Sequence, residues 1–199
     1  GSRAEAEVLV ELARRVQDRP EEAGALVQLA SALQWIEDIP AALERAREAI
    51  EIADAVGATA PLSGGLFVRG YVQGVIGRLD AAEPDLLRSL QVARTSGDPG
   101  RQALTLHALG LHKSWQGQYR EAMELNAEGA RIAREHHLVL PLLRCRWVEG
   151  LASSEIGNYD AALAALDEGL ALAEKIGDDA FIPRFLNTLG WLRIDCGDF

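Results

Sequence analysis

The sequence predicts an all-α protein of about ten antiparallel helices that form a right-handed α–α superhelix, or solenoid. Three observations support this class: a short motif recurs every 40 residues, apolar residues follow the spacing of one helix face, and Ala and Leu dominate the composition. Because Ala and Leu favour helix and the β-branched residues typical of strands are sparse, helices are expected along the whole chain. We expect one solenoid domain over residues 3–199.

The 40-residue period rests on a turn motif: Gly, then an apolar or aromatic residue two positions later, then Ala five positions after the Gly. The motif occupies residues 77–82, 117–122 and 157–162, and residues 37–42 form a weaker copy. Repeats of this length stack so that each covers the apolar face of its neighbour. The predicted repeats are residues 37–76, 77–116, 117–156 and 157–196, with a partial repeat at each end.

Each repeat is expected to hold two helices, here named helix B, which follows the turn motif, and helix A, which follows helix B. In the last full repeat, helix B is predicted over 160–176 and helix A over about 180–195, with Gly177 as the cap between them. One face of this helix B carries apolar residues at helical spacing, namely Leu163, Leu166, Leu170 and Ala173. The same period assigns residues 3–17 to a helix B without a preceding helix A.

Helix A carries a glycine near its middle, although Gly in a helix interior costs about 1 kcal/mol relative to Ala. The four glycines of this column are Gly70, Gly110, Gly150 and Gly190. The next helix B has Ala at the facing column, so we expect the two axes to approach toward the short end of the roughly 8–10 Å range. Pro84 lies within a predicted helix B and is expected to disturb the start of that helix.

The Gly-x-Tyr-x-x-Ala turn, the mid-helix glycine and the small residues of helix B resemble the tetratricopeptide repeat (TPR) family. The best copies are 157–162 and 117–122, and the resemblance covers residues 3–199. It implies a right-handed solenoid whose A helices line a concave groove. HEAT and armadillo repeats have similar lengths but lack this turn. The 40-residue copies also resemble the repeat arrays of bacterial STAND-type signalling ATPases and transcription activators.

The sequence departs from the usual TPR pattern at several columns. The period is 40 rather than 34 residues. The bulky residue that opens helix A is Leu26, Leu66, Leu106 and Leu186, but Arg146 in one copy. The usual proline after helix B is absent, and charged residues stand there: Asp54, Arg94, Arg134 and Glu174.

By resemblance, the groove-facing columns of helix A supply a partner-binding site. The candidate residues are Phe67, Tyr71, His107, Arg144, Trp147, Leu151, Arg184, Asn187 and Trp191. Arginine, aromatic and Asn side chains suit an extended peptide or an anionic small ligand. The alternative, that Trp147 and Trp191 only pack between repeats, stays open. Trp35 and Trp115, near the ends of A helices, are expected to pack against the following helix B.

Charge and composition exclude several classes of function. The formal net charge of −10 argues against a nucleic-acid-binding surface. No stretch approaches the roughly 20 apolar residues of a membrane span, so no membrane partner is expected. Two cysteines do not make a disulfide framework. Without a secretory signal, the expected location is the cytoplasm.

No catalytic or metal-binding constellation emerges from the spacing of reactive residues. His136 and His137 are adjacent and diverge on a helix, and His107 and His112 do not share a face, so we expect no metal site. Cys145 and Cys196 are expected to be packed thiols. No phosphate-binding loop or nucleophile motif is present, so we expect neither a cofactor nor an enzyme.

The leading hypothesis is a non-catalytic scaffold that binds a protein or peptide in the concave groove. The alternative is a ligand-sensing regulatory segment of a larger bacterial signalling ATPase or transcription activator. Gly1 and Ser2 are interpreted as a cloning scar, and both ends are interpreted as cuts inside a repeat. An apolar end face near Leu189, Leu192 and Phe199 is expected to favour end-to-end self-association.

Overall fold

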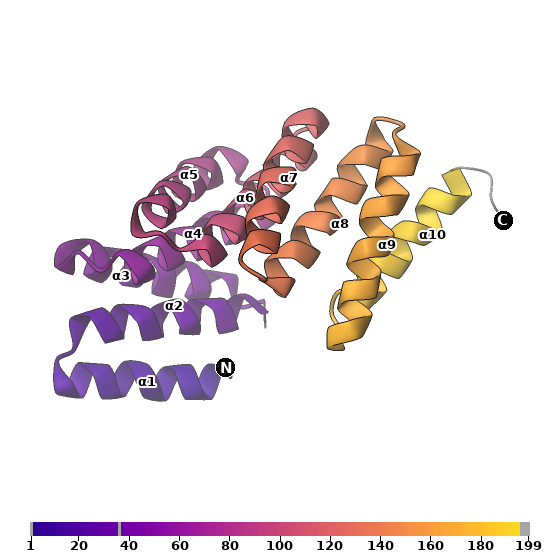
Figure 1. Ribbon diagram of the computed structural model, residues 1–199. Helices are drawn as coiled ribbons and strands as arrows, with labels where there is room; N and C mark the ends of the chain where they lie inside the picture. The colour runs from indigo at the N-terminus through magenta and orange to yellow at the C-terminus, as the bar shows by residue number, and fades with distance from the viewer. Residues whose placement is uncertain (1, 36, 196–199) are drawn as a thin grey trace. The chain divides into compact units, whose positions relative to one another are not determined.

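The computed structural model describes residues 2–35 and 37–195, and this part of the chain contains ten α-helices and no strand (Figure 1). The helices are α1 (Arg3–Val16), α2 (Arg19–Trp35), α3 (Ile39–Val56), α4 (Thr59–Val75), α5 (Leu79–Ser96), α6 (Pro99–Trp115), α7 (Tyr119–Glu135), α8 (Val139–Glu155), α9 (Tyr159–Ile176) and α10 (Ile182–Asp195). The predicted all-α class and the helix count are confirmed. Odd-numbered helices correspond to helix B and even-numbered helices to helix A. None of the ten is long and apolar enough to cross a membrane.

The helices form two compact units, Gly1–Arg101 and Gln102–Phe199, here called the N-terminal and C-terminal units. In the N-terminal unit each helix from α1 to α4 packs against the helix that follows it, and α2 also contacts α4. In the C-terminal unit α7 to α10 pack in the same way, and α8 also contacts α10. Neighbouring helices within each unit run antiparallel (Figure 1). The A helices α2, α4, α8 and α10 therefore each touch a helix B and another helix A, as stacked helical hairpins do.

One residue with a positive φ angle follows each helix from α1 to α9, and these residues recur every 20 positions. The positions are Gln17, Glu37, Gly57, Gly77, Gly97, Gly117, His137, Gly157 and Gly177. This left-handed conformation closes the helix by offering its N–H to carbonyls of the last turn, and Gly adopts it without steric cost. The 40-residue period is thus two 20-residue half-periods. Three positions hold a residue with a Cβ, including His137, where the sequence breaks the glycine column.

The glycine column of helix A confirms the predicted close approach at three of its four positions. A Cβ built on Gly70 would lie 2.8 Å from Leu86 Cγ, and one on Gly150 would lie 2.5 Å from Leu166 Cγ. At Gly110 it would overlap the amide nitrogen of Asn126. The residue that fills the space stands four positions after the predicted alanine. Gly190 has no described atom within 4 Å of its Cβ position.

The apolar faces lie where the periodicity predicts them. Leu166 and Ala173 on α9 are fully buried, with Leu163 and Leu170 packed beside them. Leu26, Leu66 and Leu106 are also fully buried. The expected disturbance at Pro84 is not observed, because α5 continues through it and the proline lies at an exposed position of the second turn.

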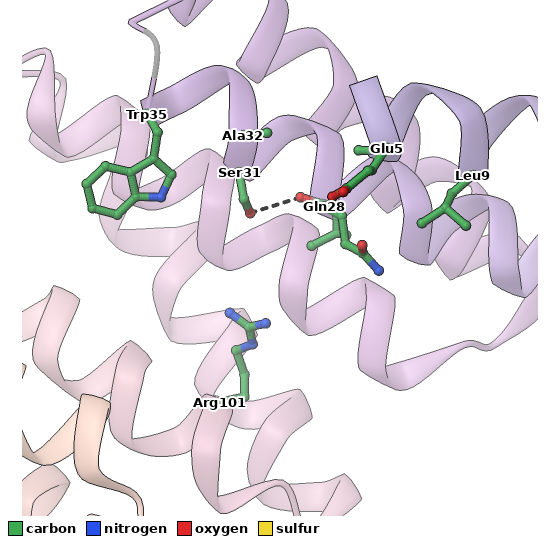
Figure 2. A pocket seen from close by; sticks show the side chains of 9 residues that line it. Glu5, Leu9, Gln28, Ser31, Ala32, Trp35 and Arg101 are labelled. Atoms are coloured by element: carbon green, nitrogen blue, oxygen red, sulfur yellow. Dashed lines mark hydrogen bonds between the residues drawn. The ribbon is translucent and has the colours of Figure 1, made fainter. Parts of the chain in front are cut away.

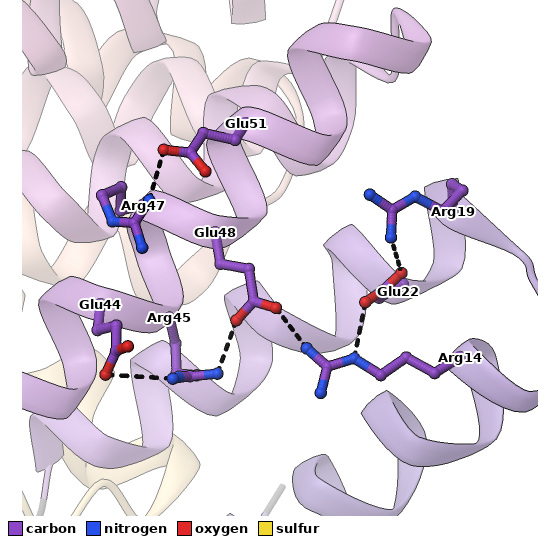
Figure 3. A network of polar contacts seen from close by, with 8 residues as sticks. All are labelled: Arg14, Arg19, Glu22, Glu44, Arg45, Arg47, Glu48 and Glu51. Atoms are coloured by element: carbon purple, nitrogen blue, oxygen red, sulfur yellow. Dashed lines mark hydrogen bonds and ion pairs between the residues drawn. The ribbon is translucent and has the colours of Figure 1, made fainter.

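Charged residues that replace the usual TPR proline pair with the next helix B. Arg14 contacts Glu48, Arg88 Nη2 lies 2.7 Å from Asp54 Oδ1, and Arg134 Nη2 lies 2.9 Å from Glu168 Oε1. Each pair spans 34 residues. Figure 3 shows the first of them, where the Arg14 guanidinium also donates to the buried Glu22 on α2 over 2.8 Å. These pairs link successive B helices.

Arg146, the one exception in the leucine column, is also held by charge. Its side chain is 14% exposed, and its guanidinium lies 2.5 Å from Glu149 and 2.7 Å from Glu168. Burial raises the pKa of the Glu149 carboxyl. The two carboxylates therefore offset the cost of placing a cation in an apolar column.

The expected apolar end face is wrong in its residues. Leu189 and Leu192 are 4% and 2% exposed, because they belong to the α10 face that packs on α8 and α9. Leu186 and Ile194 are the exposed aliphatic residues of α10. Phe199, Cys196 and Gly1 lie outside the described residues. Ser2, interpreted as part of a cloning scar, caps α1: its hydroxyl accepts from Glu5 N–H and its own N–H donates to the Glu5 carboxylate.

Candidate functional site

The nine predicted groove residues are divided between the two units, and each group is considered by itself. Phe67 and Tyr71 lie one turn apart on α4 of the N-terminal unit, with stacked rings 5.9 Å apart. Both are half-buried. The other seven residues belong to α6, α8 and α10 of the C-terminal unit.

In the C-terminal unit, a cluster of rings and guanidinium groups joins α8 to the start of α10. The rings of Trp147 and Phe181 meet edge to face at 6.1 Å. Arg184 Cζ lies 5.5 Å from the Trp147 ring and 5.1 Å from the Phe181 ring, within cation–π range. Arg144 Cζ lies 5.4 Å from the Phe181 ring. The Trp147 indole N–H donates to Thr188 Oγ1 over 3.2 Å. We call this group the Trp147 cluster.

The Trp147 cluster is packed on its inner side and open on α10. Phe181 and Phe185 are 3% and 0% exposed, so they anchor the helix. On the outer side, Arg184 and Asn187 are exposed, and Trp191 is 63% exposed. Trp147 therefore packs between helices, whereas Trp191 does not. Leu151 on α8 is half-buried.

His107 does not face a groove, contrary to expectation. It is 2% exposed, and its ring lies against the backbone of Arg144 on α8. Burial and, to a smaller extent, the nearby charge of Arg144 together lower its pKa to about 3. The imidazole is therefore neutral at physiological pH and has no access to a partner.

The N-terminal unit holds a pocket that the sequence did not single out. It has a volume of about 350 Å³ and is lined by Glu5, Ala6 and Leu9 of α1, by Val27, Gln28, Ser31, Ala32 and Trp35 of α2, and by Arg101 of α6. Figure 2 shows the Arg101 side chain pointing towards α2, from which Ser31 and Trp35 project. We call it the Arg101 pocket.

Among the described residues no carboxylate lies within ion-pair distance of the Arg101 guanidinium, although the charge of Asp98 acts on it and raises its pKa. Its Cζ lies 4.9 Å from the Phe67 ring, and burial lowers the pKa of the guanidinium. Asp98, the nearest acid in sequence, accepts instead from the Arg101 backbone N–H over 2.9 Å. Gly64 lies between Arg101 and Val27: a Cβ there would be in ordinary contact with Arg101 Nη2 at 3.5 Å but would crowd Val27 Cγ1 at 2.9 Å.

The two tryptophans at helix ends are placed differently from the prediction. Trp35 is 58% exposed and lines the Arg101 pocket. Trp115 is 47% exposed and stacks on His112 at 5.3 Å. Each is the last residue of its helix, beyond the stretch that the next helix covers. The signal that could have found the pocket is an arginine in the first turn of helix A with no acid three or four residues later.

The remaining reactive residues occupy structural positions. Burial raises the pKa of the Cys145 thiol, whose Sγ lies 3.8 Å from the Ala103 carbonyl oxygen. This confirms the predicted packed thiol at that position. His136 and His137 lie exposed just after the end of α7.

Several solved structures share this fold. A Rap protein complexed with competence and sporulation factor is 22% identical, with a TM-score of 0.80 over 92% of this chain and 54% of that chain. Aspartyl phosphate phosphatase F from Bacillus subtilis is 19% identical, with a TM-score of 0.75 over 88% of this chain and 45% of that one. A putative kinesin light chain with nearly identical TPR-like repeats from Podosopora anserina is 16% identical, with a TM-score of 0.62 over 86% and 85%.

These likenesses show the fold: the chain is built as a TPR-like helical repeat protein. It spans about half the length of two of these proteins, the Rap protein and phosphatase F. No protein-family model matches the sequence, and no curated protein matches it significantly.

Proposed function

We propose that the chain is a non-catalytic scaffold that binds a protein or peptide along its A helices. The observation that carries the proposal is the outer face of α10. Arg184, Asn187 and Trp191 are exposed there in succession, while Phe181 and Phe185 hold the helix in the core. Exposed Trp and Arg on a rigid element are the residue types that dominate binding energy at protein interfaces. A similar fold in a Rap protein complexed with a factor supports this reading.

A library of random peptides displayed against the purified chain tests the proposal. Peptides that are enriched are synthesised, and their affinity is measured by fluorescence anisotropy for the parent chain and for an Arg184→Ala/Trp191→Ala variant. We expect a loss of at least about tenfold in the variant, since each truncated anchor costs about 1 kcal/mol or more.

The matched control is Trp115→Ala, which removes an exposed tryptophan of the same unit outside the predicted groove residues. Circular dichroism establishes that both variants are folded. Equal loss in the control and the double variant, or no peptide enriched over an unrelated helical protein, would refute the assignment to α10.

The alternative is a ligand-sensing regulatory segment of a STAND-type signalling ATPase or transcription activator. One observation favours a small ligand, the 350 Å³ volume at Arg101. A ligand that binds only the folded state raises its melting temperature by mass action, so a metabolite thermal-shift screen distinguishes this alternative. End-to-end self-association is a further proposal, for which the exposed Leu186 and Ile194 replace the residues first expected. Light scattering against concentration tests it.

A further inference from the structure

We infer that α1 pairs with α1 of a second copy of the chain, in antiparallel orientation, through an apolar face that we call the α1 stripe. The stripe consists of Val8, Leu9, Leu12 and Val16, which are between 36% and 65% exposed. Residues at this spacing lie along one side of a helix. The inference does not rest on the proposed function, because α1 and α10 belong to different units.

The α1 stripe corresponds to a face that is buried in a later helix B. Leu12 is 52% exposed, whereas Ile52, at the same repeat position of α3, is 6% exposed and belongs to a core cluster that includes residues of α2. Within the N-terminal unit α1 packs on α2, and no other described helix of that unit contacts it (Figure 1). The stripe is therefore an apolar helix face without a neighbour in the described part of this unit.

The residue at position 9 does not fit a neighbour of the repeat type. The same repeat position holds small residues in the later B helices: Ala49, Ser89, Gly129 and Gly169. A Cβ on Gly129 would lie 3.2 Å from the Ala103 carbonyl oxygen, and Ser89 Oγ donates to the Ser63 carbonyl over 2.8 Å. Because the preceding helix A brings its backbone this close, Leu9 leaves no room for such a helix. The same argument disfavours α10 of a second copy, since α10 is also a helix A.

The residue at position 8 departs from the repeat as well. The later B helices carry a charged residue there, and three of these residues pair with the preceding helix B: Glu48, Arg88 and Glu168. Val8 offers no charge to a helix B of this kind. The α1 stripe is thus apolar where the repeat is charged and large where the repeat is small, which suits another apolar helix rather than another repeat.

The charges at the two ends of the α1 stripe favour a second α1 in antiparallel orientation. Glu5 lies toward the N-terminal end of the stripe and Arg15 toward its C-terminal end, and both side chains are exposed. An antiparallel pair sets Glu5 of each copy toward Arg15 of the other and opposes the two helix dipoles. A parallel pair would bring like charges together at both ends. One helix therefore supplies both halves of a complementary contact.

Sedimentation equilibrium of the purified chain measures the pair. Four side chains on one helix form a patch smaller than a standard interface of about 800 Å² per partner, so we expect a dissociation constant of about 10–100 µM. Leu12→Glu places a carboxylate in the apolar contact and should raise this constant at least about tenfold. A monomer at every concentration up to about 1 mM, well above the expected constant, overturns the inference.

The matched control is Leu87→Glu, because Leu87 is 51% exposed on α5 of the same unit and lies outside the α1 stripe. This variant should pair as the parent chain does. Circular dichroism and thermal melting establish that each variant is folded. Equal pairing of the folded Leu12→Glu variant and the parent chain overturns the inference.

A Leu186→Glu/Ile194→Glu variant separates the α1 stripe from the exposed aliphatic residues of α10. Its pairing should equal that of the parent chain. Loss of pairing in this variant alone would assign the contact to α10. Loss both here and in Leu12→Glu would indicate that α1 of one copy packs on α10 of the next. Either result overturns the pairing of α1 with α1.

Single cysteines in a Cys196→Ser background test the orientation, since the remaining Cys145 is buried. Leu12→Cys lies near the centre of the stripe, so a short bismaleimide should cross-link it. Val16→Cys should not be cross-linked. In an antiparallel pair centred between Leu9 and Leu12, its two thiols lie about 16 Å apart along the axis. Efficient cross-linking of Val16→Cys would show a parallel pair and overturn the antiparallel arrangement.

Discussion

Both units set a guanidinium group over an aromatic ring, yet one arrangement is filled and the other is open. In the C-terminal unit, Phe181 enters the space beside Trp147 and is 3% exposed. In the N-terminal unit the residue two periods earlier is Arg101, and a pocket remains beside it. The same repeat thus gives a packed junction or a cavity according to one column. The comparison indicates that a helical repeat can acquire a pocket when a buried aromatic residue such as Phe181 is replaced, at the same repeat position, by an arginine such as Arg101.

The largest expected effect comes from breaking the filled junction. Phe181→Ala should lower the free energy of unfolding by about 3–5 kcal/mol, because a buried phenylalanine leaves a cavity between the Trp147 and Phe185 rings. Arg101→Ala, at the corresponding column, should change it by under about 1 kcal/mol or raise it, since burial disfavours this cation and it makes no ion pair with the described residues. Urea unfolding followed by circular dichroism measures both. Equal losses would show that the two sites do not differ in packing.

A second difference between the units is their response to acid. All four histidines follow residue 101, and His107 is buried with a pKa of about 3, against 6.5 for an ordinary histidine. Below about pH 6.5 the unfolded chain therefore binds a proton that the folded chain does not. Stability should fall by about 2 kcal/mol between pH 7 and pH 5 through this group, which amounts to roughly 1.4 kcal/mol per pH unit below 6.5.

The measurement is urea unfolding at both pH values for the parent chain and His107→Leu. The variant should lose this part of the slope, whereas its stability at pH 7 reports only on packing. An unchanged slope in the variant would mean that His107 takes up its proton in the folded state. Hydrogen exchange by mass spectrometry should place the acid-induced opening in residues 102–199.

The smallest expected effect concerns the turns between helices. Each unit contains a non-glycine residue there whose positive φ angle strains the backbone. Gln17 and His137 have φ values of 57° and 56° and are exposed. Gln17→Gly and His137→Gly should each stabilise the fold by about 0.5–1 kcal/mol, because glycine adopts this conformation without a Cβ clash. Thermal melting of the two variants compares the units directly. A drop in melting temperature at either position would point to a side-chain contact that offsets the strain.

Local periodicity was enough to predict the helices of this chain. The glycine columns and the apolar i, i+3, i+7 pattern predicted α9 and α10 to within two residues of their observed bounds. The close approach of the next helix at Gly70 and Gly150 was predicted because glycine destabilises a helix interior and a tight helix contact can compensate for this. These features depend on short-range steric rules that a sequence displays.

The candidate site was predicted less well, because burial at a given column differs between copies. His107 and Trp147 share a column, yet one is fully buried and the other half-buried. Arg101 was missed because its burial beside Phe67 and the pocket next to it depend on contacts between helices, which spacing alone does not reveal. Trp35 was misplaced because helix ends extend past the neighbouring helix. The burial of these residues depends on which side chains of neighbouring repeats are in contact, and a single sequence does not show those contacts.

The ion pairs between successive B helices give the repeats an order. The pair Arg14–Glu48 has its cation on the earlier helix, Arg88–Asp54 has it on the later one, and Arg134–Glu168 returns to the first polarity. A tandem duplication of residues 37–76 would therefore set Asp54 against a second Glu48, and like charges would meet. Melting temperatures should show the duplicated array recovering when the inserted junction carries Asp54→Arg. The repeats are similar in shape but not interchangeable. The signs of the charges on their B helices determine which repeats can stand next to each other.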